Sequence, residues 1–446
     1  MIKKEKIKTI SLLILVGFLI SVAYHNILGG WPFNLPYPFN SFVTAPSYRF
    51  SDYIRSYDFD SARDLTSIFV TKTLVGSTKM PISLFIKSIF TLPPLKVGLI
   101  FFLLTFIGFH LYNIYRNVKI NEDWSYHDFI IISCLTYPFL MAIERANVEI
   151  ILYIFICMFL YSYQKKKFLL SSIWLSLAIA MKLFPAIFIL LFFSDKKYKE
   201  ILHIIMFLIG WLFLPLFLFK GALSENISMI FTGLDQFREH YIIGYNGVHY
   251  GHSLWGAFKV VFYGLMDWIF NHENMSSWVA NFLGRNVTDL NSVSVVHGVL
   301  KYLTLPYTAF VLMLTGCVTY YIKYKERELW IKVALLVFAM NLFPFVSNSH
   351  KMIYVYLPLL LFINSESGKR DKIFCILFAL LMIPKHYVPL YWTPPYSLTG
   401  EPGDLQTWSE VLIDPLLMLI FAGVIMWDGI KLSKIKLRTI IDKVSG

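Results

Sequence analysis

Long apolar runs alternate with short polar segments from one end of the chain to the other. The longest runs reach the roughly 20 residues that a helix needs to cross the hydrocarbon core of a bilayer. Lipid offers no hydrogen-bond partners, so a segment that crosses it must satisfy its own backbone, and a helix does so. The pattern therefore predicts an all-α polytopic membrane protein with about 12 transmembrane helices. They are expected near residues 8–25, 95–115, 128–143, 146–163, 168–181, 184–194, 201–219, 302–322, 330–344, 352–364, 372–384 and 413–427.

Basic residues between the runs orient the chain in the membrane. Lys and Arg cluster in alternate loops, which the positive-inside rule assigns to the cytoplasm together with both termini. Two long polar segments then face outward, residues 26–80 and residues 220–300. Within the second, residues 254–270 are apolar, but a crossing there would move the basic loop 323–327 outside. We therefore expect 254–270 to form a re-entrant or interfacial helix, and 81–92 to lie on the membrane surface.

The composition is that of a membrane protein, and it argues against nucleic-acid binding and metal binding. The 446 residues are 57% hydrophobic and only 15% charged, whereas a soluble protein carries about 25% charged residues. The net charge of +12 lies in short loops between apolar runs, which argues against a nucleic-acid-binding face. The four cysteines fall within apolar runs and no Cys/His cluster suggests a metal, so we expect neither a metal nor a cofactor. No loop is long enough to fold alone, and residues 1–446 are interpreted as one domain.

Unusual polar residues collect at the predicted outer face. Asp52 lies in the acidic stretch 49–60 just after the first span, where it is either a solvated loop charge or a catalytic base. Arg145 lies at the outer end of a span, and its spacing to Glu149 is that of a structural ion pair on one helix. Lys182 breaks a tight hairpin between two spans. Charges at the edges of apolar spans either snorkel to the interface or face a partner or a water-filled cavity.

These positions limit the donor that an outward-facing enzyme could use. Nucleotide sugars and ATP are made inside the cell, and the chain has neither GxGxxG nor GxxxxGK[ST] to hold their phosphates. A reaction on the outer face therefore needs a donor that crosses the membrane as a lipid, and a polyprenyl phosphate that carries a sugar meets this need. Arg145 and Lys182 supply cations for its phosphate at the membrane edge. Asp52 supplies a base for an acceptor hydroxyl.

Four short segments resemble motifs of one group of enzymes. Arg145-Ala146-Asn147-Val148-Glu149 resembles an Arg-Gly-Asn-x-(Asn/Asp) segment, with Ala146 in place of Gly, and 178–185 resembles an apolar-x-Lys-x-x-Pro segment downstream. Residues 251–257 are similar to an Asn-Gln-Ser-Leu loop, and 347–350 to a Ser-Pro-x-x-x-His ending that here lacks its Pro. The group is the GT-C superfamily of membrane glycosyltransferases, which includes the polyprenyl-phosphate-mannose-dependent α-mannosyltransferases. Asp52 stands where these enzymes carry their catalytic Asp.

The resemblance implies a GT-C-like helical bundle and an inverting transfer of mannose or another hexose. The donor would be a polyprenyl-phosphate sugar, the acceptor a glycolipid or a glycan, and no metal would be required. Asp52 would act as the base, with Asp58 as its rival. The donor phosphate would be bound by Arg145, Lys182 and His350. The further expected substrate contacts are Tyr53, Glu144, Asn147, His252, Ser253 and Trp255.

Two other functions remain open from the sequence. A polysaccharide polymerase or ligase would also have many spans and outward Arg residues, but would use a diphosphate-linked glycan. A flippase or transporter would bind the lipid phosphate without chemistry, yet the chain shows no repeated halves of the kind common in transporters. Interfacial aromatic belts compete with sugar stacking as the explanation for Tyr53 and Trp255. We expect the site on the outer face of a bacterial plasma membrane.

Overall fold

A computed structural model describes most of the chain. The described residues are 1–35, 39, 41, 43, 49–54, 80–117, 124–219, 221–244, 248, 251–270, 293–326, 328–385, 389–390, 407–408 and 410–444. Side chains are described in these ranges except at 267–270, 293–296, 389–390, 407–408 and 428–444. Asp58, most of the predicted outer loop 26–80 and parts of 220–300 lie outside the described residues.

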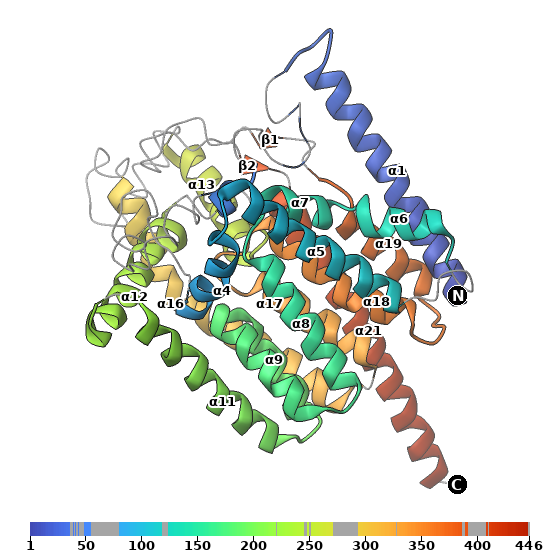
Figure 1. The fold of residues 1–446 in the computed structure, drawn as a ribbon. Helices are drawn as coiled ribbons and strands as arrows, with labels where there is room; N and C mark the ends of the chain where they lie inside the picture. Colours follow the sequence, from blue (N-terminus) through green and yellow to red (C-terminus); the bar gives the residue numbers. More distant parts are fainter. Residues whose placement is uncertain are drawn as a thin grey trace.

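The all-α polytopic membrane fold predicted from the sequence is confirmed (Figure 1). Within the described residues, five helices are long and apolar enough to cross a membrane. Four coincide with α1 (Lys3–Gly29), α5 (Leu95–Asn117), part of α16 (Val293–Tyr324) and part of α21 (Glu410–Val444), and the fifth joins α11 (Tyr198–Phe213) to η4 (Leu214–Leu218). A sixth span results if α6 (Tyr126–Cys134) and α7 (Tyr137–Arg145), which meet at a bend of 50°, are counted as one.

The remaining apolar helices are shorter than a bilayer is thick, so the expected number of about 12 spans is not established. Several of them form the interior of the bundle, where helices apolar on all sides bury every face against protein. In α17, for example, all ten residues from Val333 to Leu342 are buried. These shorter elements are α4 (Pro81–Thr91), α8 (Glu149–Gln164), α9 (Phe168–Met181), η3 (Phe184–Phe188), α10 (Ile189–Ser194), α13 (Leu254–Phe270), α17 (Leu329–Leu342), η7 (Ser349–Val355), α18 (Tyr356–Ile363) and α19 (Asp371–Met382).

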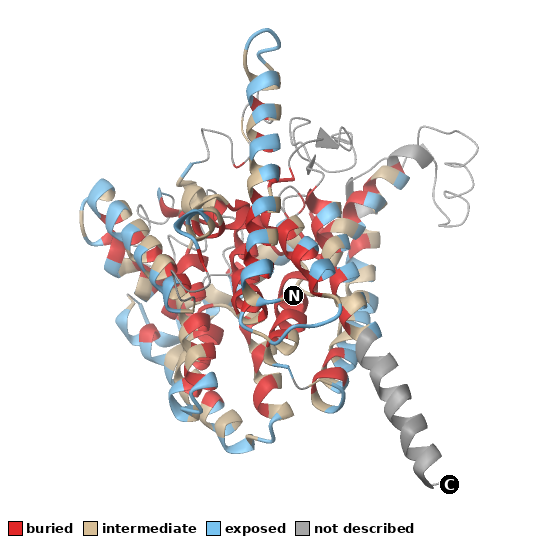
Figure 2. Cartoon of the chain, turned by 90° about the vertical axis from the view of Figure 1, so that its right-hand side faces the viewer, coloured by how far each residue is buried: buried red, intermediate tan, exposed pale blue. Residues whose placement is uncertain are grey.

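The long helices lie around this interior and expose apolar side chains outward (Figure 2). Such side chains line α1, α5, α11 and α16, and they include Leu12, Leu104, Met206 and Leu312. In a bilayer these faces contact lipid, which is as apolar as they are. The segment 220–300, which was predicted to face outward, contributes α12 (Leu223–Phe237), the π-helix η5 (Arg238–Ile243) and α13. The helix expected at 254–270 is therefore present, and its position relative to the bilayer stays a prediction. Residues Pro389–Leu390 (β1) and Thr407–Trp408 (β2) form a short antiparallel pair.

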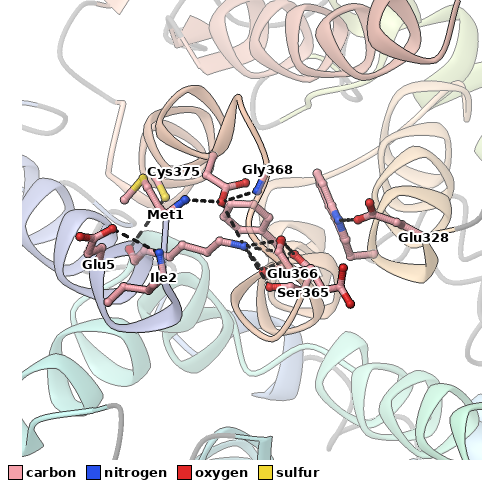
Figure 3. Close-up of polar contacts among 12 residues, drawn as sticks. Met1, Ile2, Glu5, Glu328, Ser365, Glu366, Gly368 and Cys375 are labelled. Atoms are coloured by element: carbon pink, nitrogen blue, oxygen red, sulfur yellow. Dashed lines mark hydrogen bonds and ion pairs between the residues drawn. The ribbon is translucent and has the colours of Figure 1, made fainter. Parts of the chain in front are cut away.

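The start of α1 is bound to the C-terminal third of the chain, and Figure 3 shows Met1 and Glu5 near Ser365, Glu366 and Gly368. The Lys6 ammonium is fully buried, lies 3.4 Å from the Asp371 carboxylate and donates to the backbone oxygens of Phe362, Ser365 and Glu366. A buried ammonium is tolerated only when its hydrogen bonds are satisfied, and here they are. Asp371 opens α19, against which α1 packs along its length.

We predict that Gly98→Ala destabilises the protein, because this glycine of α5 lies directly against the backbone of α4. A Cβ at residue 98 would stand 2.1 Å from the backbone oxygen of Phe90 and 2.5 Å from the Tyr53 hydroxyl. Forcing these atoms apart costs about 1–3 kcal/mol, which thermal unfolding in detergent would measure. Gly108→Ala in the same helix is the matched control, because a Cβ there meets no described atom within 4 Å. Equal melting temperatures for the two variants would contradict the prediction.

Candidate active site

A left-handed turn at Ala146 separates two charged side chains that the sequence suggested might pair. Helix α7 ends at Arg145, Ala146 has φ of +46°, and α8 begins at Glu149. The amide oxygen of Asn147 accepts a hydrogen bond from the Glu149 backbone N–H at 3.1 Å, which satisfies the first backbone donor of the new helix. Because the chain turns between them, Arg145 and Glu149 do not share a helix, and each pairs with a residue elsewhere. The structural ion pair considered from their spacing is therefore wrong.

Ala146 stands at the position that Gly occupies in the motif that this segment resembles. Its left-handed backbone conformation explains why Gly suits this position. A positive φ costs an L-residue roughly 1–2 kcal/mol but costs Gly nothing. We predict that Ala146→Gly is close to neutral, because relief of this strain offsets the loss of a buried methyl group. Ala146→Val is expected to lower stability by several kcal/mol, since a β-branched residue is poorly tolerated at positive φ. Thermal melts of the two purified variants test this, and a stable Val variant would contradict it.

Asp52 accepts hydrogen bonds from two residues of this turn. The Arg145 guanidinium donates from Nε at 3.1 Å and from Nη2 at 2.7 Å, one to each carboxylate oxygen. The Asn147 side-chain amide donates to the same carboxylate at 2.8 Å. Such a two-pronged contact between Arg and a carboxylate fixes both groups in position. The side chains of Asp52 and Arg145 are 19% and 18% exposed, so both remain accessible from the protein surface.

The segment that carries Asp52 is held from both sides. The backbone N–H of Phe50 donates to the Glu144 carbonyl at 2.6 Å, and Arg49 lies 3.6 Å from the Glu144 carboxylate. On the other side, Lys87 of α4 donates to the backbone oxygen of Asp52 at 2.8 Å. These contacts give Glu144 a role in anchoring the segment, while its expected contact with substrate stays a prediction.

Tyr53 is buried rather than exposed for stacking. Its side chain has no accessible surface, its hydroxyl donates to the Phe90 backbone oxygen at 2.6 Å, and its ring lies 5.4 Å from the ring of Phe102. In this arrangement the residue ties the segment 49–54 to α4 and α5. Its expected contact with a sugar would need the ring to leave this position.

The electrostatic surroundings keep Asp52 ionised. Burial by itself would raise the pKa of the Asp52 carboxyl group, but the charge of Arg145 opposes it, followed by the hydrogen bond from Asn147 and the charge of Lys87. The net result is that the pKa of Asp52 is lowered below its usual range. An ionised carboxylate can accept a proton, but one that a guanidinium stabilises this strongly is a weak base.

Glu149 is the centre of a second group of contacts that the sequence did not select as part of the site. Its carboxylate is 1% exposed, accepts hydrogen bonds from the Lys182 ammonium and the Tyr354 hydroxyl, and lies 3.8 Å from the His350 ring. Lys182 itself keeps 17% exposure. The signal available in the sequence was an acid two residues after Asn147, at the last position of the motif around Arg145.

The short segment η7 joins the two groups. Burial lowers the pKa of His350 to about 3, so its imidazole is neutral. The charges of Asp52, Arg145, Glu149 and Lys182 all act on His350. We refer to these five residues together with Asn147 as the charge cluster. It brings together the predicted base and all three predicted phosphate-binding residues, although their roles are not tested by this geometry.

His252, Ser253 and Trp255 belong to a neighbouring loop with packing roles of its own. The backbone N–H of His252 donates to the Ser347 oxygen at 2.8 Å, and its ring lies 3.5 Å from the buried carboxylate of Asp414. The Ser253 hydroxyl accepts from the Gly256 N–H at 2.9 Å and thereby caps α13. Trp255 is 1% exposed, with its ring packed against aromatic neighbours. Their contacts with substrate stay predictions.

Two acidic residues of α21 lie next to the loop that contains His252 and Ser253, and form a third group of polar contacts. Glu410 accepts hydrogen bonds from Tyr137 at 2.9 Å and from Ser349 at 2.5 Å, while Asp414 lies 2.8 Å from the Lys385 ammonium. Ser349 precedes His350 directly, so η7 contacts both these acids and the charge cluster. Among the described residues, no set of three or more His, Cys, Asp and Glu side chains is arranged to hold a metal ion. The expectation of a metal-independent reaction stays a prediction.

The chain matches a known protein family. Residues 80–347 match the model of glycosyltransferase family 87, which is more than half of the chain. The matched stretch includes Arg145, Glu149 and Lys182, whereas Asp52 precedes it and His350 follows it. No curated protein matches the chain.

Proposed function

Because the chain belongs to glycosyltransferase family 87, a family of GT-C-type membrane enzymes, we propose that it transfers a sugar from a polyprenyl-phosphate donor. The acceptor is a hydroxyl group of a glycolipid or a glycan, and the reaction takes place on the outer face of a bacterial plasma membrane. The sugar is mannose or another hexose, and its anomeric configuration is inverted. Membership of a glycosyltransferase family argues against a flippase that performs no chemistry.

This proposal is supported most directly by one observation: the charge cluster contains one partly accessible acid and two partly accessible cations. Asp52 supplies a proton acceptor, and Arg145 and Lys182 supply the positive charge that a lipid phosphate requires. Arg145 ends α7 and Lys182 follows α9 directly, so both cations lie at the ends of apolar helices, within reach of a donor whose lipid tail stays in the bilayer. The sequence has no phosphate-binding glycine loop that would favour a nucleotide donor instead.

Binding of the donor would require Arg145 to exchange partners. In the present arrangement the guanidinium directs hydrogen bonds at Asp52. When a phosphate draws it away, Asp52 loses the strongest of the charges that lower its pKa, and that pKa rises toward its usual value. The carboxylate is then a better base. Donor binding would thus prepare the base, and Asp52 would be kept weak while the donor is absent.

The reaction itself forms one bond and breaks another. The acceptor oxygen attacks the anomeric carbon and gives its proton to the Asp52 carboxylate, while the bond from that carbon to the phosphate oxygen breaks. The polyprenyl phosphate leaves with the electron pair. Arg145 and Lys182 stabilise the negative charge that develops on it, which is where fixed cations lower a barrier most. The neutral imidazole of His350 makes a further contact with the phosphate or the sugar.

A comparison of donors tests this function. The purified full-length chain in detergent would be supplied with a polyprenyl-phosphate hexose, a polyprenyl-diphosphate glycan or a nucleotide hexose, each with glycolipid acceptors. We expect product from the first donor alone. Lys182→Gln should raise the KM for this donor. Lys199→Gln, at the start of α11 and separated from Lys182 by η3 and α10, should not. Transfer from the diphosphate-linked glycan would support the polymerase or ligase alternative, and transfer from the nucleotide sugar would contradict the proposal.

A further inference from the structure

A pocket lies at the end of α8 opposite the charge cluster. It is enclosed by the last turns of α5 and α8 and by α18, which lie side by side in Figure 1. Its cavity volume is about 60 Å³. The residues of α8 that line the pocket lie between Cys157 and Gln164, so at about 1.5 Å per residue the pocket begins roughly 12 Å from Glu149 and extends away from it. It is therefore separate from the site of the proposed reaction.

The pocket is apolar within and polar at its rim. Leu357 and Leu360 of α18 line it and are each 5% exposed. Arg116, in the last turn of α5, and Gln164, at the end of α8, also line it and are exposed. This combination suits a ligand with a hydrocarbon part and a polar or charged head. A free inorganic anion would leave the apolar wall without a partner.

Arg116 gives the rim a positive charge that none of the acids among the described residues neutralises. Its guanidinium lies 3.5 Å from the centre of the Tyr161 ring, and within the described part of the chain it forms no ion pair with an acidic side chain. Lys165, Lys166 and Lys167 follow Gln164 directly and are exposed. Arg116 ends a helix long enough to span the bilayer, which puts it at the level of lipid headgroups. Basic pockets between helices at this level suit anionic lipids.

We propose that this pocket binds one anionic phospholipid from the leaflet opposite the charge cluster. One acyl chain lies against the leucines of α18, and the headgroup phosphate accepts hydrogen bonds from Arg116. The planar guanidinium presents two N–H groups to a phosphate while its face stays on Tyr161. A zwitterionic lipid would satisfy the wall equally well but would bring its own cation to a basic rim. This inference does not depend on which sugar donor the enzyme uses.

Lipid titration followed by native mass spectrometry tests the proposal. The delipidated full-length chain in detergent would be titrated with phosphatidylglycerol, phosphatidylcholine, polyprenyl phosphate or glycerol 3-phosphate. We expect one tightly retained phosphatidylglycerol, and about tenfold weaker binding in Arg116→Gln, since a charge-assisted contact is lost. Leu361→Trp, which fills the pocket, should also weaken binding. Lys325→Gln, a basic residue in a different loop, should bind as the unsubstituted protein does.

Each other outcome would count against the proposal. Equal retention by Arg116→Gln would show that the lipid is held elsewhere. Equal retention of phosphatidylcholine would show that charge does not select the lipid. If glycerol 3-phosphate bound as tightly as phosphatidylglycerol, and in an Arg116-dependent way, the acyl chain would have no role. Stronger Arg116-dependent retention of polyprenyl phosphate would assign the pocket to the donor. Arg116 is exposed, so its replacement leaves the packed interior unchanged, and a thermal melt of each variant would verify this.

Discussion

Asp52→Asn is expected to slow sugar transfer by roughly 10²–10⁴-fold, the usual contribution of a general base. Asparagine has almost the same size and still accepts a hydrogen bond from Arg145, but it cannot take up the acceptor proton. Because the guanidinium is held less strongly by a neutral amide, the donor should bind as tightly as before or more tightly. Initial rates over a range of donor concentrations would therefore show a large fall in kcat with an unchanged or lower KM.

Asp58→Asn is the matched comparison, because Asp58 is the rival base in the same acidic stretch and lies outside the described residues. We expect this variant to keep most of its activity. Full activity of Asp52→Asn together with an inactive Asp58→Asn would transfer the role of base to Asp58. A fall in both kcat and melting temperature of Asp52→Asn would instead indicate that the carboxylate only supports the turn around Arg145.

Glu149→Ala is expected to destabilise the protein by about 3–5 kcal/mol, the usual cost of breaking a buried ion pair from one side. The carboxylate accepts hydrogen bonds from both Lys182 and Tyr354 and has almost no contact with solvent. Its removal leaves the fully buried Tyr354 hydroxyl and the mostly buried Lys182 ammonium without their acceptor. Thermal unfolding in detergent would measure the effect. Glu149→Gln should cost less, because it keeps an acceptor oxygen.

Glu144→Gln provides the control for this experiment. Glu144 also pairs with an arginine, but Arg49 is half exposed and the separation is 3.6 Å. Ion pairs in contact with water contribute about 0–1 kcal/mol, so the melting temperature should change little. Similar losses in the two variants would show that burial of Glu149 does not determine its contribution.

The membrane fold could be predicted from apolar runs alone, but the number of spans could not. A short run of apolar residues looks the same whether its helix crosses lipid or is surrounded by other helices. The residues of α17 illustrate this, since all sides of the helix are apolar because protein covers them. The bend between α6 and α7 was equally hidden, although Pro138 near the start of α7 fits a new helix there.

The proximity of Asp52 to Arg145 followed from topology, because both were assigned to the same membrane edge. The partners of Glu149 could not be found in this way. Lys182 is 33 residues away along the chain and Tyr354 is 205 residues away, and no local pattern specifies either contact. Spacing even favoured the wrong partner for Glu149, because a periodicity argument assumes a continuous helix and the left-handed turn at Ala146 interrupts it. Burial of Tyr53 and Trp255 likewise depends on contacts between distant segments.

The anchor of α1 has a consequence for how the chain is assembled in the membrane. Lys6 is inserted early, but Ser365, one of its acceptors, is 359 residues further along the chain. At a synthesis rate of about 5–20 residues per second, Lys6 waits on the order of 20–70 s for this acceptor. During that interval its ammonium must stay hydrated at the membrane surface. The docking of α1 against α19 is therefore a late step of biogenesis, and a nascent chain halted before residue 365 cannot complete it.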